Sequence, residues 1–153
     1  MRRKGRRKRG QGEERRGRLP AAHSIEERPK GADGRMRLGD READAVIGKR
    51  GGACLVALVD GKSRFPIGGK SKRQASKQVS EVMMRPLEGQ PCESITPDRG
   101  KEFAGYQLVA KKTGVQFHFA QPSCPWQRGA NGNTNGLLRE YFPHLNHLPP
   151  THL

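Results

Sequence analysis

Three short apolar runs, separated by glycine-rich turns, lie between residues 42 and 69. The first (42–49, EADAVIGK) predicts a short strand, the second (54–60, CLVALVD) a buried strand and the third (63–69, SRFPIGG) another strand. The glycines between the runs suit tight turns, so we expect the three strands to form an antiparallel meander. Pro66 has no backbone N–H to donate, which places the third run at an edge of the sheet or breaks it locally.

Helical and strand-like patterns alternate in the following stretch. The predicted elements are, in chain order, a helix over 70–84, a strand over 93–96, a helix over 103–112, a strand over 115–119 and a helix over 132–141. The first of these helices has apolar residues on one face, and we expect Pro86 and Gly89 to end it. Three strands followed by alternating helices and strands predict an α/β fold with a mixed sheet.

Basic residues are densest near the N-terminus. Residues 1–37 carry 14 Lys and Arg against 5 Asp and Glu, in a chain whose formal net charge is +15. Residues 1–18 show no apolar periodicity, so they bury too little surface to offset the entropy of ordering. We expect a largely disordered basic arm and linker over 1–37, a folded core over 38–143 and an irregular tail over 144–153.

This excess of positive charge indicates a polyanionic partner, for which nucleic acid is the leading candidate. The arm residues expected to contact phosphates are Arg2, Arg3, Lys4, Arg6, Arg7, Lys8 and Arg9. A tail that is merely solvated is the alternative. The three cysteines are widely spaced and form no CxxC pair, which favours a reducing compartment. No apolar run has the length of a membrane span, so a cytoplasmic protein without a membrane partner is expected.

Two aspartates are the candidate metal ligands. Asp44 lies within the first apolar run, where a carboxylate is costly to bury unless it is paired or metal-bound. Asp98 follows the 93–96 strand, at the end of a strand where α/β sheets commonly bind ligands. On neighbouring strands the two could share a divalent cation, because Mg²⁺ prefers oxygen ligands. Spacing alone favours the other interpretation, in which Asp44 faces solvent and Asp98 caps a turn with Gly100.

Six sequence blocks recur in the order and spacing of a known family. They are GRLP (17–20), SIEERP (24–29), GDREAD (39–44), LVALVDGKSRF (55–65), ITPDRGKEFA (95–104) and SCPWQRGANGNTNGLLREYFP (123–143). Over residues 17–143 the chain resembles the bacterial insertion-sequence transposases of the IS-thirty family. That resemblance implies a ribonuclease-H-like catalytic core of the retroviral-integrase type, with a mixed sheet and flanking helices.

The resemblance also implies a role for particular residues. Asp44 matches the first catalytic aspartate of the family and Asp98 the second. The family's third acid is a glutamate, and its position here is occupied by Gly132. Arg41 stands where the family usually has tryptophan, and Arg99 where it usually has asparagine. The chain is further expected to be truncated, without the family's N-terminal helix-turn-helix region.

The cofactor and partners follow from the same resemblance. Mg²⁺ or Mn²⁺ is the expected cofactor, bound by Asp44 and Asp98. The expected partners are DNA, as transposon ends and target, and further copies of the chain, at a bacterial nucleoid. Independently of the resemblance, Lys101 and Arg128 lie around the predicted site, where they could contact DNA phosphates or could simply belong to a solvated face.

The leading functional prediction is a DDE transposase core, which cleaves phosphodiesters and transfers strands with the help of metal ions. In that chemistry one ion activates the nucleophile and another stabilises the leaving oxygen. Gly132 offers no side-chain oxygen, so the activity is expected to be defective here. Two alternatives stay open: a basic nucleic-acid-binding protein without catalysis, and a decayed gene product that does not fold stably.

Overall fold

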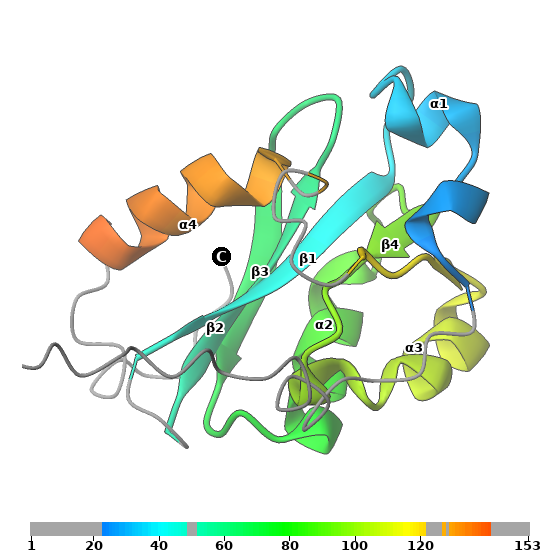
Figure 1. Ribbon diagram of the computed structural model, residues 1–153. Helices are drawn as coiled ribbons and strands as arrows, with labels where there is room; N and C mark the ends of the chain where they lie inside the picture. The colour runs from blue at the N-terminus through cyan, green and yellow to red at the C-terminus, as the bar shows by residue number, and fades with distance from the viewer. Residues whose placement is uncertain (1–22, 49–51, 122–126, 128, 142–153) are drawn as a thin grey trace, which may run out of the picture.

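The computed structural model describes residues 23–48, 52–121, 127 and 129–141 (Figure 1). Its centre is a five-stranded sheet in the order β3-β2-β1-β4-β5. The strands are β1 (Asp40–Ile47), β2 (Cys54–Asp60), β3 (Pro66–Ser71), β4 (Ser94–Thr96) and β5 (Gln116–Phe117). β1, β2 and β3 pair antiparallel as a meander, whereas β4 pairs parallel with both β1 and β5. The predicted mixed sheet is therefore confirmed.

Helices cover both faces of the sheet. They are η2 (Ile25–Glu27), α1 (Lys30–Asp33), α2 (Ser76–Leu87), η3 (Lys101–Phe103), α3 (Tyr106–Thr113) and α4 (Gly129–Tyr141). Figure 1 shows α4, in orange, on the opposite side of the sheet from α2 and α3. α2 packs on β2 and β3, and α4 packs across β1 and β2.

The two faces of β1 have different neighbours because side chains alternate along a strand. Ala43 and Ala45 belong to the main core, together with residues of α2 and α3. Val46 belongs to a second cluster, which includes Leu138 of α4. Even-numbered positions of β1 therefore face α4, and Asp44 is one of them.

Several predicted boundaries need correction. The third strand begins at Pro66, since residues 66–71 pair with β2, and the helix after it begins only at Ser76. Pro66 is the first residue of an edge strand, as its missing N–H predicts. Pro86 does not end α2 but lies inside its last turn. α4 begins three residues earlier than predicted, at Gly129.

The stretch before β1 is more structured than the linker predicted from sequence. η2 begins with a capping box in which Ser24 and Glu27 satisfy each other's backbone N–H groups. Ile25 is buried, and Ser24 forms a parallel bridge with Phe119, far along the chain. The described part of the predicted arm and linker, residues 23–37, thus packs on the core. The division of the chain at residues 37 and 143 stays a prediction, and residues 1–22 and 144–153 lie outside the described ranges.

Candidate carboxylate site on the sheet

β1 and β4 bring the two predicted aspartates to the same part of the sheet. The strands run parallel, with Glu42 opposite Thr96 as the last paired residues. Asp44 follows Glu42 by two residues, and Asp98 follows Thr96 by two. Both side chains are half-buried. β1 therefore holds one carboxylate and the loop after the neighbouring β4 holds the other, an arrangement that suits the sharing of one cation.

Each aspartate also makes a local hydrogen bond. Oδ1 of Asp98 accepts the N–H of Gly100 at 2.9 Å, so the turn-capping role allowed by spacing is present. Oδ1 of Asp44 accepts the N–H of Ala45 at 2.8 Å. These bonds orient the carboxylates but use only part of their acceptor capacity, because an ionised carboxylate has about four lone-pair sites. Capping and metal binding are thus compatible.

Glu102 is a third carboxylate of the site, which sequence reasoning missed. Its residue is buried in η3, and the amide of Gln74 donates to Oε2 at 3.4 Å. Burial foremost, and then the charges of Asp98 and Asp44, raise the pKa of Glu102 above its ordinary value. The carboxylate of Glu102 therefore lies within electrostatic range of both Asp98 and Asp44. Glu102 lies within the block ITPDRGKEFA (95–104), in which Asp98 is the predicted metal ligand.

Gly100 makes this arrangement possible. A Cβ at that position would lie 2.6 Å from the carboxylate of Glu102, closer than real side-chain carbons approach such atoms. A larger residue at position 100 would therefore require the carboxylate of Glu102 to move.

α4 lies over the face of the sheet that carries Asp44. Asp44 is paired with Ala57 of β2, and Ala57 contacts the α4 cluster around Leu138. Gly132, the position expected for the third acid, lies in the first turn of α4. In the ranges that the structure describes, no group of three or more His, Cys, Asp and Glu side chains has metal-binding geometry. Lys101 is exposed at the start of η3, and Arg128 and the arm residues 2–9 lie outside the described ranges.

Three arginines near the site have distinct surroundings. Arg35 reaches over the α4 face, with Nη2 at 3.8 Å from Oε1 of the buried Glu42. Arg99 donates from Nε to the carbonyl of Ala120 at 3.2 Å. Arg41 is buried, donates from Nε to the carbonyl of Pro91 at 3.2 Å, and has a buried Nη1 without a hydrogen-bond partner in the described part of the chain.

Among the helices that the structure describes, none has the length and apolar character needed to cross a membrane.

Solved structures with a similar fold identify the fold class of this chain. A catalytic core domain of bovine immunodeficiency virus integrase superimposes with a TM-score of 0.56 and 13% identity, over 68% of this chain and 68% of that one. A chain of a simian T-cell lymphotropic virus intasome gives 0.55 and 21%, over 72% of this chain and 43% of that one. The fold is thus ribonuclease-H-like, of the integrase catalytic-core type, as the sequence predicts.

Sequence comparison relates the chain to a particular group of transposases. The chain is 38% identical to the transposase of insertion sequence IS4351 of Bacteroides fragilis, over 94% of its own length. It is 40% identical to the InsI transposase of IS30A of Escherichia coli K12, over 78% of its length. No family model matches. These matches confirm the predicted relationship: the chain is related to insertion-sequence transposases and is consistent with an IS30-family transposase.

The relatives are longer than the part matched. The match covers 45% of the IS4351 transposase and 32% of the IS30A transposase. The chain therefore spans between about a third and a half of the length of these curated relatives.

Proposed function

We propose that this chain carries the catalytic core of a DDE transposase, whose substrate is DNA, and that its strand-transfer chemistry is defective. The observation that carries the proposal is the parallel register of β1 and β4. It supports placing Asp44, on β1, near Asp98, in the loop that follows β4, because each lies two residues beyond the pair Glu42–Thr96. The position of the third acid, Gly132, lies on the helix that covers this face.

Asp44 and Asp98 are the proposed ligands of one divalent cation, Mg²⁺ or Mn²⁺. Carboxylate oxygens suit these hard ions. Burial chiefly raises the pKa of Glu102, and the charges of Asp98 and Asp44 add to that shift, so a cation would also offset the repulsion among these carboxylates. When bound, such an ion supplies Lewis acidity toward a phosphoryl oxygen. Asp44 and Asp98 can together bind one ion. The family's site has a third acidic ligand, and Gly132 at that position supplies no side-chain oxygen.

The chain's own residues would bind and orient DNA at this site. Lys101 is exposed beside Glu102, where its ammonium group can neutralise a phosphate. We also propose phosphate contacts for Arg128 and for the basic residues 2–9, and assembly with further copies of the chain on DNA ends.

The test restores the third acid. Cleavage and strand transfer would be measured with Mn²⁺ on matching transposon-end DNA, for the unchanged chain, Gly132→Glu, and Gly132→Glu with Asp98→Asn. We expect no activity from the unchanged chain, a gain with Gly132→Glu, and loss of that gain when Asp98 is also changed.

Binding of Mn²⁺, followed by paramagnetic broadening of the NMR signals around Asp44, gives a readout that needs no turnover. Activity of the unchanged chain would show that Gly132 does not silence the site. If Gly132→Glu stays inactive and Mn²⁺ binding is unaffected by Asp98→Asn, the carboxylate site is not the one used. The chain is then better described as a DNA-binding protein without catalysis.

A further inference from the structure

Residues 23–28, which we call the strap, lie along the outer edge of the sheet beyond β5. Two backbone hydrogen bonds attach it there: Ile25 N–H to the carbonyl of Phe119, and Phe119 N–H to the carbonyl of His23, each 2.9 Å long. Ile25 is 6% exposed and supplies the strap's buried apolar contact. Two side-chain hydrogen bonds add to the two backbone bonds: Arg28 Nη1 donates to Oγ1 of Thr96 at 3.3 Å, and Gln121 Nε2 donates to Oε1 of Glu26. So short an attachment buries little apolar surface, and small changes beneath it can decide whether it stays closed.

His118 lies beneath the strap. It is 4% exposed, and its Nδ1 is buried without a hydrogen-bond partner in the described residues. The centroid of its ring lies 6.1 Å from that of His23 on the strap. A buried imidazole whose nitrogen lacks a partner tolerates the neutral form much better than the charged form.

The charged and titratable neighbours reinforce this preference. Four charged or titratable groups interact electrostatically with His118: His23, Glu27 and Arg28 of the strap, and Asp40 of β1. Burial foremost, then His23 and Arg28, lower the pKa of His118, and the opposing effect of Glu27 and Asp40 is smaller. His118 is therefore neutral in the closed form at neutral pH.

We propose that the strap is a proton-sensitive latch, which closes over neutral His118 and is released when His118 is protonated. Release exposes the imidazolium to water and moves it away from the cations on the strap. The neighbouring cavity would then open, because His23 and Glu27 form one wall of it.

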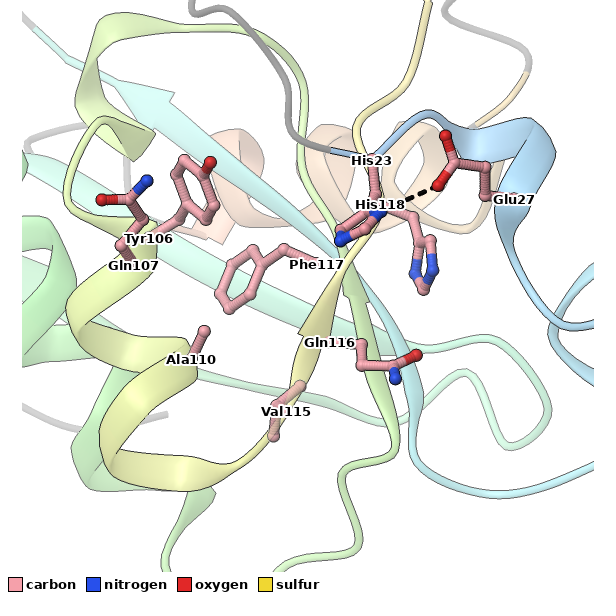
Figure 2. A pocket seen from close by; sticks show the side chains of 9 residues that line it. All are labelled: His23, Glu27, Tyr106, Gln107, Ala110, Val115, Gln116, Phe117 and His118. Atoms are coloured by element: carbon pink, nitrogen blue, oxygen red, sulfur yellow. Dashed lines mark hydrogen bonds and ion pairs between the residues drawn. The ribbon is translucent and has the colours of Figure 1, made fainter.

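Figure 2 shows that cavity, which has a volume of about 470 Å³ and lies between the strap, α3 and β5. Its inner wall is formed by Tyr106 and Phe117, whose ring centroids are 5.6 Å apart. Opening of the strap would therefore uncover an aromatic surface at the edge of the sheet.

The direction of the pH effect follows from linkage. The pKa of His118 is lower with the strap closed than with it open, so the open form binds more protons as the solution becomes acidic. Closure is complete above the ordinary histidine value of about 6.5 and weakens as the pH falls below it.

The experiment is amide hydrogen exchange on the full chain between pH 7.5 and 5.5, corrected for the intrinsic pH dependence of exchange. The amides of Ile25 and Phe119 report on the latch, and that of Val56 in the interior strand β2 reports on global unfolding. We expect protection of the first two to fall, roughly tenfold for each unit by which closure lowers the pKa of His118. Protection of Val56 should fall by no more than this factor, because His118 also regains its ordinary pKa in the unfolded chain, and should stay well above that of the two strap amides.

Matched variants distinguish the contribution of His118 to the pH dependence from that of His23. His118→Gln and His118→Phe should both abolish the pH dependence at Ile25 and Phe119, whereas His23→Gln should retain it. NMR titration of the His118 ring in the unchanged chain gives a test that needs no variant. A His118 that titrates at or above the ordinary value, or strap protection that does not change across its titration, would overturn the proposal.

Discussion

Single residues carry much of what distinguishes this core, and Arg41 is the sharpest case. A guanidinium that is 3% exposed, with a buried Nη1 lacking a hydrogen-bond partner in the described ranges, carries a desolvation cost. We therefore predict that Arg41→Met, which keeps the chain length and removes the charge, raises the free energy of unfolding by about 1–3 kcal/mol. The midpoint of thermal or urea unfolding measures this gain.

The matched control for that prediction is Arg99→Met. Arg99 is only half-buried and its Nε is bonded to the carbonyl of Ala120, so its replacement should bring no gain. Equal shifts for the two variants, or a loss of stability with Arg41→Met, would show that the buried guanidinium is adequately solvated or paired. An apolar residue at position 41 also agrees with the tryptophan that the family resemblance implies there.

At the scale of elements, sequence reasoning placed strands better than it placed short helices. The strand at Cys54–Asp60 was predicted with its observed limits, because a continuous apolar run between glycines leaves little choice. Sequence reasoning missed Glu102 because η3 is only one turn long. The burial of Glu102 depends on Asp98, Gln74 and Gly100 meeting in space. α4 begins at Gly129 despite its Gly- and Asn-rich sequence, since the packing of Leu138 overrides weak local propensity.

The hairpin of β2 and β3 yields a prediction at the same scale. The carboxylate of Asp60, at the end of β2, accepts the N–H groups of Gly39 at 2.7 Å, Lys62 at 3.0 Å and Ser63 at 2.8 Å. Burial alone would raise the pKa of Asp60, but the hydrogen bonds from Ser63, Gly39 and Lys62 outweigh it and lower the pKa. This carboxylate therefore ties the turn to the start of β1.

We predict that Asp60→Asn destabilises the fold by about 2 kcal/mol at pH 7, because an amide is a weaker acceptor than a carboxylate. The depressed pKa means that the stabilisation is complete above the unfolded value of about 3.9 and is lost as the pH falls through the folded value. Urea unfolding from pH 7 to pH 3 should thus show the variant and the unchanged chain converging at acid pH. A constant difference would assign the loss to packing.

At the scale of the whole molecule, the chain is strongly basic but has an acidic site, and we expect these two features to contribute separately to the proposed DNA binding. The net charge of +15 attracts phosphates without regard to sequence, and each phosphate neutralised makes binding more salt-dependent. We predict that changing the seven Lys and Arg residues among residues 2–9 to Gln lowers the slope of log K against log salt concentration by up to about 6 on duplex DNA.

The matched control changes charge at the carboxylates. Asp44→Asn with Asp98→Asn removes two negative charges from the site, so it should strengthen DNA binding slightly in the absence of divalent ions and leave the salt slope nearly unchanged. Fluorescence anisotropy over a range of KCl concentrations measures both variants on the same duplex. If the arm variant keeps the slope of the unchanged chain, the phosphate contacts belong to residues other than 2–9. Residues 2–9 are then a solvated tail, and DNA binding depends on the basic residues that follow them.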